Sequence, residues 1–192
     1  MEDQIMNEIF KFDANRQLDR QQIILAVQKD EAQNQFIDRV FNTKQAAEEV
    51  YRVVDKLLVE RYCLEKGKKI KTKSRVTCQE TTKNARRLLE ILKYSAESIS
   101  ETVQYPVENM EKCHEVAKNI ITASIQYENV LTQFQVSLEN ETVDESISLL
   151  EKVDEEHKMI CSLLNSFPAL HKKNHRLEAI EKNVRNITRE NS

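Results

Sequence analysis

Residues 110–138 read MEKCHEVAKNIITASIQYENVLTQFQVSL, and this stretch decides the fold class. Apolar or small side chains recur there in alternating steps of three and four residues. That spacing places them on one stripe of an α-helix, as in helices that pack along a shared seam. The stripe consists of Met110, Cys113, Ala117, Ile120, Ser124, Tyr127, Leu131, Phe134 and Leu138. It predicts a helix over 107–139 whose stripe is covered by other helices, and we expect these residues to serve in assembly with a partner.

The composition supports the same fold class. The chain of 192 residues has one Gly and two Pro, which leaves little material for the turns of a β-sheet protein or for a phosphate-binding enzyme loop. A charged fraction of 32%, an aromatic fraction of 6% and the absence of Trp are typical of long, solvent-exposed helices. We therefore expect an all-α protein without a β-sheet, whose long amphipathic helices form hairpins or an elongated, coiled-coil-like bundle.

Two further stripes precede Pro106 and predict an α-helical hairpin over 1–105. The first begins near Leu18 and predicts a helix of about 45 residues, or about 70 Å; its members are Leu18, Ile24, Leu25, Ala32, Phe36, Val40, Ala47, Val50, Val54, Leu57 and Leu64. The second consists of Cys78, Ala85, Leu88, Leu92, Ser95, Ile99 and Val103. Between them lies KGKKIKTKSR (66–75), which is either a reversing loop or an exposed stretch of helix. We favour a reversal, because it sets the two stripes face to face.

The chain from 106 to 192 is predicted to hold three helices, over 107–139, 143–167 and 168–190, which pack as a second hairpin or continue the bundle. Tyr105-Pro106 is expected to end the preceding helix, with Pro106 in the first turn of the next. Thr142 and Glu145 have the spacing of a capping box. The last two stripes are Leu149, Val153, Ile160, Leu163 and Phe167, and then Leu170, Leu177, Ile180, Val184 and Ile187.

Charge is distributed unevenly along a chain whose net charge is −3. Between Arg61 and Lys93, eleven Lys or Arg stand against three acids, whereas eight acids stand against one Lys between Glu139 and Glu156. The basic patch predicted to bind anions is Lys66, Lys68, Lys69, Lys71, Lys73, Arg75, Arg86 and Arg87. It is either a surface for polyanions or charge that keeps the hairpin tip soluble. If the acidic stretch lies close to the basic patch in the fold, it neutralises the charge of the patch. If the two regions lie at opposite ends of the molecule, both are available to partners.

No arrangement of residues predicts catalysis, a cofactor or a metal site. His171 and His175 share a helix face, but their neighbours are cationic and a zinc site needs more ligands. His114 and His157 look isolated, and the acids around His157 form a charged face rather than a catalytic pair. Four cysteines without a CxxC pair are expected to be reduced and buried on helix faces. No apolar run suggests a signal peptide or a transmembrane segment.

These features favour a non-enzymatic structural or adaptor subunit of a larger eukaryotic assembly, acting through coiled-coil contacts. Its general look is similar to small coiled-coil subunits of kinetochore, spindle or centrosomal complexes, an analogy of composition and pattern. Irregular seams favour other helical proteins as partners over a homodimer. The basic patch predicts a further partner, which is an acidic polymer or an anionic surface. We expect no sequence-specific binding of nucleic acid. We expect a cytoplasmic or nuclear protein, associated with the cytoskeleton on the same analogy. The alternative is a membrane-surface-binding helical dimer of BAR type.

Overall fold

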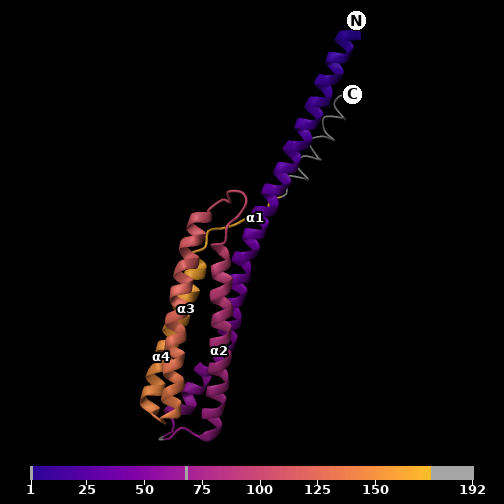
Figure 1. Ribbon diagram of the computed structural model, residues 1–192. Coiled ribbons are helices and arrows are strands. Elements are labelled where there is room, and N and C mark those ends of the chain that lie inside the picture. The colour runs from indigo at the N-terminus through magenta and orange to yellow at the C-terminus, as the bar shows by residue number, and fades with distance from the viewer. Residues whose placement is uncertain (1, 68, 174–192) are drawn as a thin grey trace, which may run out of the picture. The chain divides into compact units, whose positions relative to one another are not determined.

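The computed structural model describes residues 2–67 and 69–173, except for the side chains of residues 2, 3, 8–10, 12 and 13. Four helices make up most of this part of the chain (Figure 1): α1 (Glu2–Glu65), α2 (Thr72–Ile99), α3 (Met110–Glu139) and α4 (Val143–Asn165). None of the described residues forms a strand. The predicted all-α fold is therefore confirmed.

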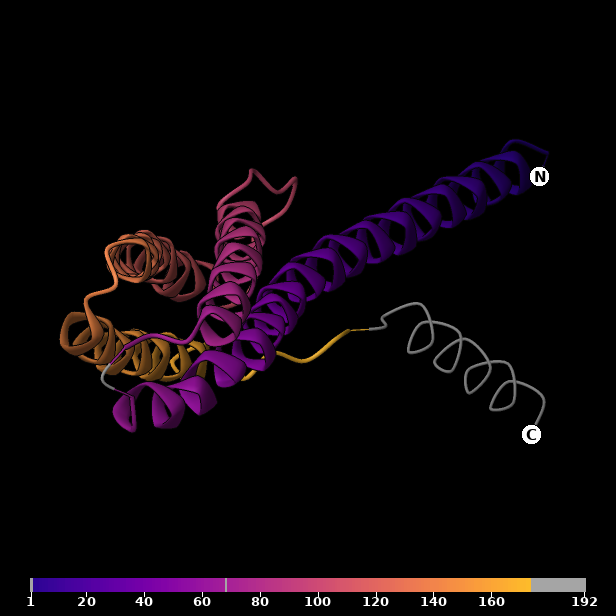
Figure 2. The same ribbon diagram turned by 90° about the horizontal axis from the view of Figure 1, so that it is seen from below.

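Residues 38–102 and 109–169 form one compact unit, an antiparallel four-helix bundle. In Figures 1 and 2 each helix runs opposite to the one before it, and α1 contributes only its C-terminal half. The Tyr51 ring of α1 lies 4.8 Å from the His157 ring of α4, and Arg39 of α1 donates a hydrogen bond to the Ser98 carbonyl of α2. α3 packs directly against both α2 and α4. Since α1 also buries apolar side chains such as Val50, Val54 and Leu57, all four helices contribute to the core.

The core is built from positions that alternate in steps of three and four along every helix, as the sequence pattern predicts. The first predicted stripe is confirmed from Phe36 to Leu64, and each of its named members in that range is buried. The stripe of α3 is buried from Cys113 to Leu138, whereas Met110 is half-exposed. Burying a Leu, Ile or Phe side chain fully contributes about 1.5–3 kcal/mol each. These seams therefore supply the main stabilisation of the bundle.

The predicted stripe of α2 is wrong by one residue at two positions. Leu89 and Ala96 are buried, whereas the predicted Leu88 and Ser95 are only half-buried. The buried set of α2 is Cys78, Thr82, Ala85, Leu89, Leu92, Ala96 and Ile99. Adjacent leucines are equivalent in a hydropathy pattern, and a rotation of about 100° separates them on a helix. Packing against α3 and α1, rather than local sequence, decides which of the two faces inward.

Hydroxyl side chains in the core are satisfied by their own helices. Thr43, Thr82 and Ser124 each donate to the carbonyl four residues earlier, at distances of 2.9, 2.7 and 2.7 Å. Ser137 and Ser146 join α3 to α4 through hydroxyl oxygens 2.8 Å apart. Since a buried polar group is costly only when it lacks a hydrogen bond, these small residues fit an otherwise apolar seam.

Three predicted helix boundaries differ clearly from the structure. α1 begins at Glu2 rather than near Leu18. α2 ends at Ile99 rather than at Tyr105, and α3 begins at Met110, so Pro106 lies in the connection rather than in a first helical turn. Asn109, the residue before α3, has a left-handed backbone with φ of 59°. Asn tolerates this conformation better than most residues, which lets the chain enter α3 from the connection.

The turn between α3 and α4 replaces the predicted capping box with another arrangement. Thr142 does precede α4, but its hydroxyl bonds the Glu145 carboxylate and the Ser137 carbonyl instead of a backbone N–H. Glu141 adopts a left-handed backbone, with φ of 56°, and the amides of Glu141 and Thr142 donate to the carbonyls of Leu138 and Ser137. This is a Schellman-type ending of α3 without the usual glycine.

A second compact unit has residues 2–37, 103–108 and 170–173 as its described part. Here two short segments lie against α1 through polar contacts. The amide of Asn34 forms two 3.0 Å hydrogen bonds with the backbone of Lys173, and Gln33 accepts from the Glu108 amide. Tyr105 donates to the Gln28 side chain at 2.7 Å. Residues 168–173 are not helical, and the rest of the predicted helix 168–190 lies outside the described residues.

Candidate functional site

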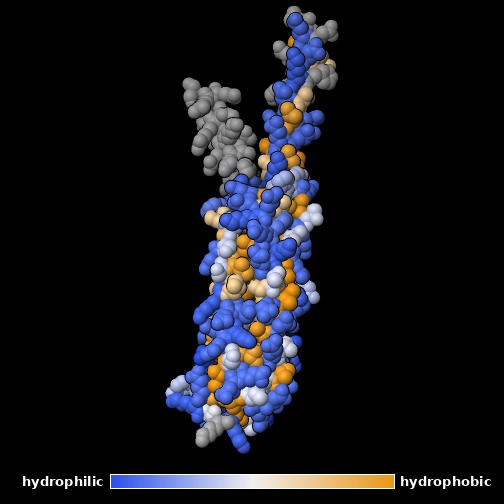
Figure 3. Space-filling model, turned by 90° about the vertical axis from the view of Figure 1, so that its left-hand side faces the viewer, coloured by the Kyte–Doolittle hydropathy of each residue, from blue (hydrophilic) through white to orange (hydrophobic). Residues whose placement is uncertain are grey.

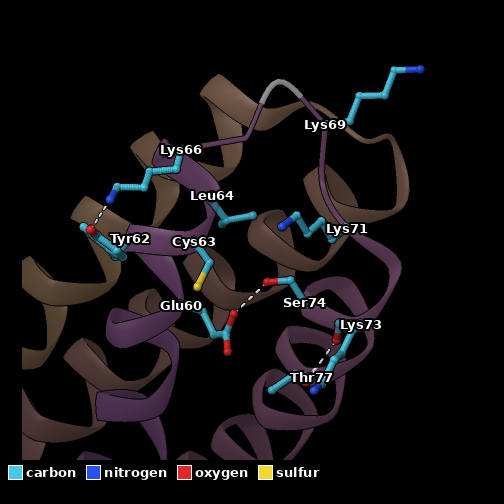
Figure 4. Close-up of a pocket in the computed structure, with 10 residues that line it drawn as sticks. All are labelled: Glu60, Tyr62, Cys63, Leu64, Lys66, Lys69, Lys71, Lys73, Ser74 and Thr77. Carbon is cyan, nitrogen blue, oxygen red and sulfur yellow. Dashed lines mark hydrogen bonds between the residues drawn. The ribbon is translucent and has the colours of Figure 1, made fainter.

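A cavity of about 430 Å³ lies at the α1–α2 turn of the four-helix bundle (Figure 4). The end of α1, the residues of the turn and the first turns of α2 line it. Four lysines contribute to its walls: Lys66, Lys69, Lys71 and Lys73. The chain reverses here, as favoured from the sequence, but the reversal occupies residues 66–71, because residues 72–75 already belong to α2. Four of the eight residues predicted to bind anions thus share one site; Lys68 lies outside the described residues.

The lining of the cavity includes one acid, Glu60, and its carboxylate is already engaged. Ser74 donates to it at 2.6 Å, so a hydroxyl rather than a lysine satisfies this carboxylate. Lys66 lies over the ring of Tyr62, with its Nζ 4.1 Å from the ring centroid. The N-cap of α2 makes no side-chain hydrogen bond, and the first turn of α2 holds no acid. The local field at the cavity is therefore positive.

Three arginines of the basic stretch between Arg61 and Lys93 form ion pairs with residues of other parts of the bundle. Arg75 pairs with Glu141 at 2.7 Å, and Arg86 pairs with Glu128 at 3.6 Å. Arg61 bridges Glu65 of its own helix and Glu151 of α4, both at 2.7 Å. Planar guanidinium groups suit such cross-links between helices better than ammonium groups do. The structure thus divides the predicted patch: two of its arginines join helices, and the lysines are left at the cavity.

The acidic stretch lies at the same end of the bundle as the basic turn. The ion pair of Arg75 with Glu141 joins the start of α2 to the α3–α4 turn, and both turns lie at the lower end in Figure 1. The two charged regions therefore approach each other, and the arrangement at opposite ends does not occur. Neutralisation is partial, because Lys69, Lys71 and Lys73 form no ion pair with any described residue.

The predicted assembly stripe is enclosed within the chain. Cys113, Ala117, Ile120, Tyr127, Leu131, Phe134 and Leu138 are all buried in the bundle. Helices α2 and α4 of the same chain pack against α3 and cover it. Any contact with a partner protein must therefore use other surfaces of the described chain.

The N-terminal part of α1 is the largest stretch of helix that is left uncovered. None of the described side chains from residue 4 to residue 29 is buried. Leu18, Ile24 and Leu25 have exposed fractions of 53%, 56% and 41%. The early members of the first predicted stripe are therefore not part of the core, which corrects that prediction. Figure 3 shows apolar side chains along this part of the helix.

His157 is buried in the bundle rather than isolated. Its ring lies between Tyr51 of α1 and Tyr127 of α3, and its Nε2 is 3.3 Å from the Cys161 sulfur. Desolvation lowers the pKa of His157 and raises the pKa of the Cys161 thiol. Both shifts favour neutral groups, and none of the described residues forms a hydrogen bond with the Nδ1 of the imidazole. A cysteine nucleophile needs the opposite arrangement, so the pair fits a structural role. Spatial proximity across helices leaves no signal in the sequence.

The cysteine prediction holds for two residues of four. Cys78 and Cys113 are buried, whereas Cys63 and Cys161 are exposed, and all four are free thiols. His171 is exposed, and His175 lies outside the described residues. No cluster of His, Cys, Asp or Glu suited to a metal ion occurs among the residues that could be described. In the same part of the chain, no helix is both long and apolar enough to cross a bilayer.

The candidate site is therefore a lysine-lined cavity on a helical bundle, together with an uncovered apolar stretch of α1. Comparison with protein-family models, curated proteins and solved structures gives no match.

Proposed function

We propose that this protein is a non-enzymatic structural subunit of a larger eukaryotic assembly, and that it binds a helical partner through residues 18–32 of α1. The observation that carries the proposal is the exposure of Leu18, Ile24 and Leu25 on a helix that buries no described side chain before Asp30. Helices in water gain most of their stability from burying an apolar face. An uncovered face on a long helix therefore favours a partner.

The exposed face prolongs the buried stripe of α1 along the same side of the helix. Leu18, Leu25 and Ala32 follow one another in heptad steps. They lie 18, 11 and 4 residues before Phe36, and at about 100° per residue each falls within about 40° of the Phe36 direction. The side of α1 that is buried from Phe36 onward is therefore exposed at Leu18 and Leu25, which favours a partner there.

The composition of the face favours a different protein over a second copy. Arg20, Gln21 and Gln22 interrupt its apolar residues, and a symmetric zipper needs a regular apolar repeat on both helices. Kinetochore, spindle or centrosomal complexes are the kind of assembly proposed, by analogy with their small helical subunits. The BAR-type alternative has less support, because the unpaired lysines gather at one end of the bundle beside acidic residues.

The test is isolation of the tagged protein from its native cell, followed by reconstitution with the purified companion. Leu18→Asp with Leu25→Asp places charge on the proposed face and should abolish this binding, since an interface cannot solvate an unpaired carboxylate. The control is Ile125→Asp with Val136→Asp, which changes two side chains that are each 48% exposed on α3. It should leave binding intact.

Three results would count against the proposal. They are a companion that binds both double variants equally, a chain that sediments as a homodimer sensitive to Leu18→Asp, and a chain without any stoichiometric companion. Circular dichroism of both variants should match the parent, which separates loss of binding from loss of fold.

A further inference from the structure

We propose that the lysine-lined cavity at the α1–α2 turn binds a short acidic peptide segment of another protein. This inference does not depend on the helical contact of the N-terminal part of α1, since the two surfaces share no residue. The first observation is the charge at the cavity. Lys69, Lys71 and Lys73 form no ion pair with any described residue. Arg61, Arg75 and Arg86, from the same basic stretch between Arg61 and Lys93, all do. Unpaired cations around a cavity attract an anion.

The directions of the lysines favour several separated charges over one phosphate group. In Figure 4 the Lys71 side chain extends across the cavity toward Leu64, whereas Lys69 points away from it. Lys66 turns aside to Tyr62. A single phosphate needs donors that converge, and arginine forks hold it best, but none of the described arginines lines this cavity. Carboxylates spaced along an extended peptide can meet such divergent ammonium groups one by one.

The surroundings of the cavity restrict the size of the anion. Glu141, in the neighbouring α3–α4 turn, is held close by Arg75, and Glu139, Asp144 and Glu145 surround it in the sequence. These acids repel a large polyanion such as a nucleic acid duplex or an anionic bilayer. Ile70, the single apolar residue of segment 66–75, is only 7% exposed, so the turn has no apolar residue to insert into a membrane. A narrow peptide can contact the lysines without meeting the acidic turn.

The wall of the cavity also offers apolar contact. Tyr62, which is 60% exposed, lines it beside the lysines, whereas Leu64 at the same wall is only 2% exposed. An aliphatic side chain among the acids of the peptide therefore has a surface to cover, and this adds selectivity to an otherwise electrostatic contact. The expected ligand is an acidic segment with an interspersed Leu or similar residue.

The experiment measures binding of a fluorescein-labelled, glutamate-rich peptide with one central leucine to the full-length protein, by anisotropy at two ionic strengths. We compare Lys69→Glu/Lys71→Glu/Lys73→Glu with the equally charged control Lys112→Glu/Lys118→Glu/Lys152→Glu, whose three lysines are also exposed. The cavity variant should bind about tenfold more weakly or worse, because three ion pairs are lost and replaced by repulsion. The control variant should bind within about twofold of the parent, since its changes act only through the screened net charge.

Inositol hexakisphosphate, phosphatidylserine vesicles and a single-stranded oligonucleotide serve as competing probes. The inference is supported if all three probes bind more weakly than the peptide. It is also supported if the probes bind but the substitutions of the cavity lysines do not change their affinity. The inference is overturned if the peptide does not bind, if both triple variants weaken it equally, or if one of the other probes binds more tightly with the same lysine dependence. Binding of the helical companion to the Leu18→Asp/Leu25→Asp variant is measured in a separate experiment. Either proposal can therefore fail without the other.

Discussion

Truncation of Leu131 tests whether the stripe of α3 is covered within a single chain. Leu131 has no exposed surface and lies on the face of α3 that packs against α2 and α4. Leu131→Ala removes three carbon atoms and leaves a cavity that the surrounding helices fill only partly. Such changes cost about 2–5 kcal/mol of unfolding free energy. At about 2–4 °C per kcal/mol for a domain of this size, a cost near 3 kcal/mol lowers Tm by about 6–12 °C.

The assay is urea and thermal unfolding of the purified variant, followed by circular dichroism at widely different protein concentrations. The control is Leu18→Ala, because Leu18 is 53% exposed and its truncation should change stability by no more than about 0.5 kcal/mol. If helices of the same chain cover Leu131, the loss of unfolding free energy does not depend on the protein concentration. The reasoning is refuted if Leu131→Ala unfolds at the same urea concentration as the parent, or if its loss of stability appears only where the chain self-associates.

Three more predictions concern buried groups of the bundle. The pKa of His157 is lowered by desolvation, so below the ordinary value of about 6.5 the unfolded chain takes up a proton that the folded chain resists. Stability should therefore fall as pH drops through that value towards the lowered pKa, and His157→Gln should flatten this part of the profile of unfolding free energy against pH. The hydroxyl of Tyr127 is buried without a partner, so Tyr127→Phe should leave stability unchanged or raise it by up to about 1 kcal/mol in urea titrations. Burial raises the pKa of Cys78 to about 12, whereas Cys63 is exposed. Mass spectrometry after alkylation should show modification of Cys63 in the folded protein and of Cys78 only on unfolding, and equal rates would contradict the packing of α2.

Local pattern was sufficient where chemistry and spacing agreed. The heptad steps from Phe36 to Leu64 and from Cys113 to Leu138 identified buried positions, because only a helix brings residues three and four apart onto one face. The run of lysines around the single Gly excluded a buried seam over 66–75, and the second stripe that follows it favoured a reversal over an exposed stretch of helix. The α-helical nature of the chain follows from these facts alone, whereas the α1–α2 turn was the favoured one of two alternatives.

The hydropathy pattern was insufficient where either of two adjacent residues could occupy a buried position. Leu88 and Leu89 are equivalent in hydropathy, and only packing selects Leu89. Leu18 and Leu25 continue the helical face of the core stripe, but they are 53% and 41% exposed. Helix ends also escaped prediction, because the chain leaves α2 at Ile99 although no Pro or Gly is close by.

What the sequence determines by itself is the set of helices and most of their apolar faces, since periodicity is a property of each segment. The tertiary structure alone decided which neighbour covers each face and which charges meet. It enclosed the α3 stripe within the chain, joined Arg75 to Glu141 and left Lys69, Lys71 and Lys73 at a cavity without an ion pair to any described residue. It also placed His157 between Tyr51 and Tyr127. These outcomes depend on distances between residues far apart in the chain, and such distances are set when side chains from different helices fill the same space.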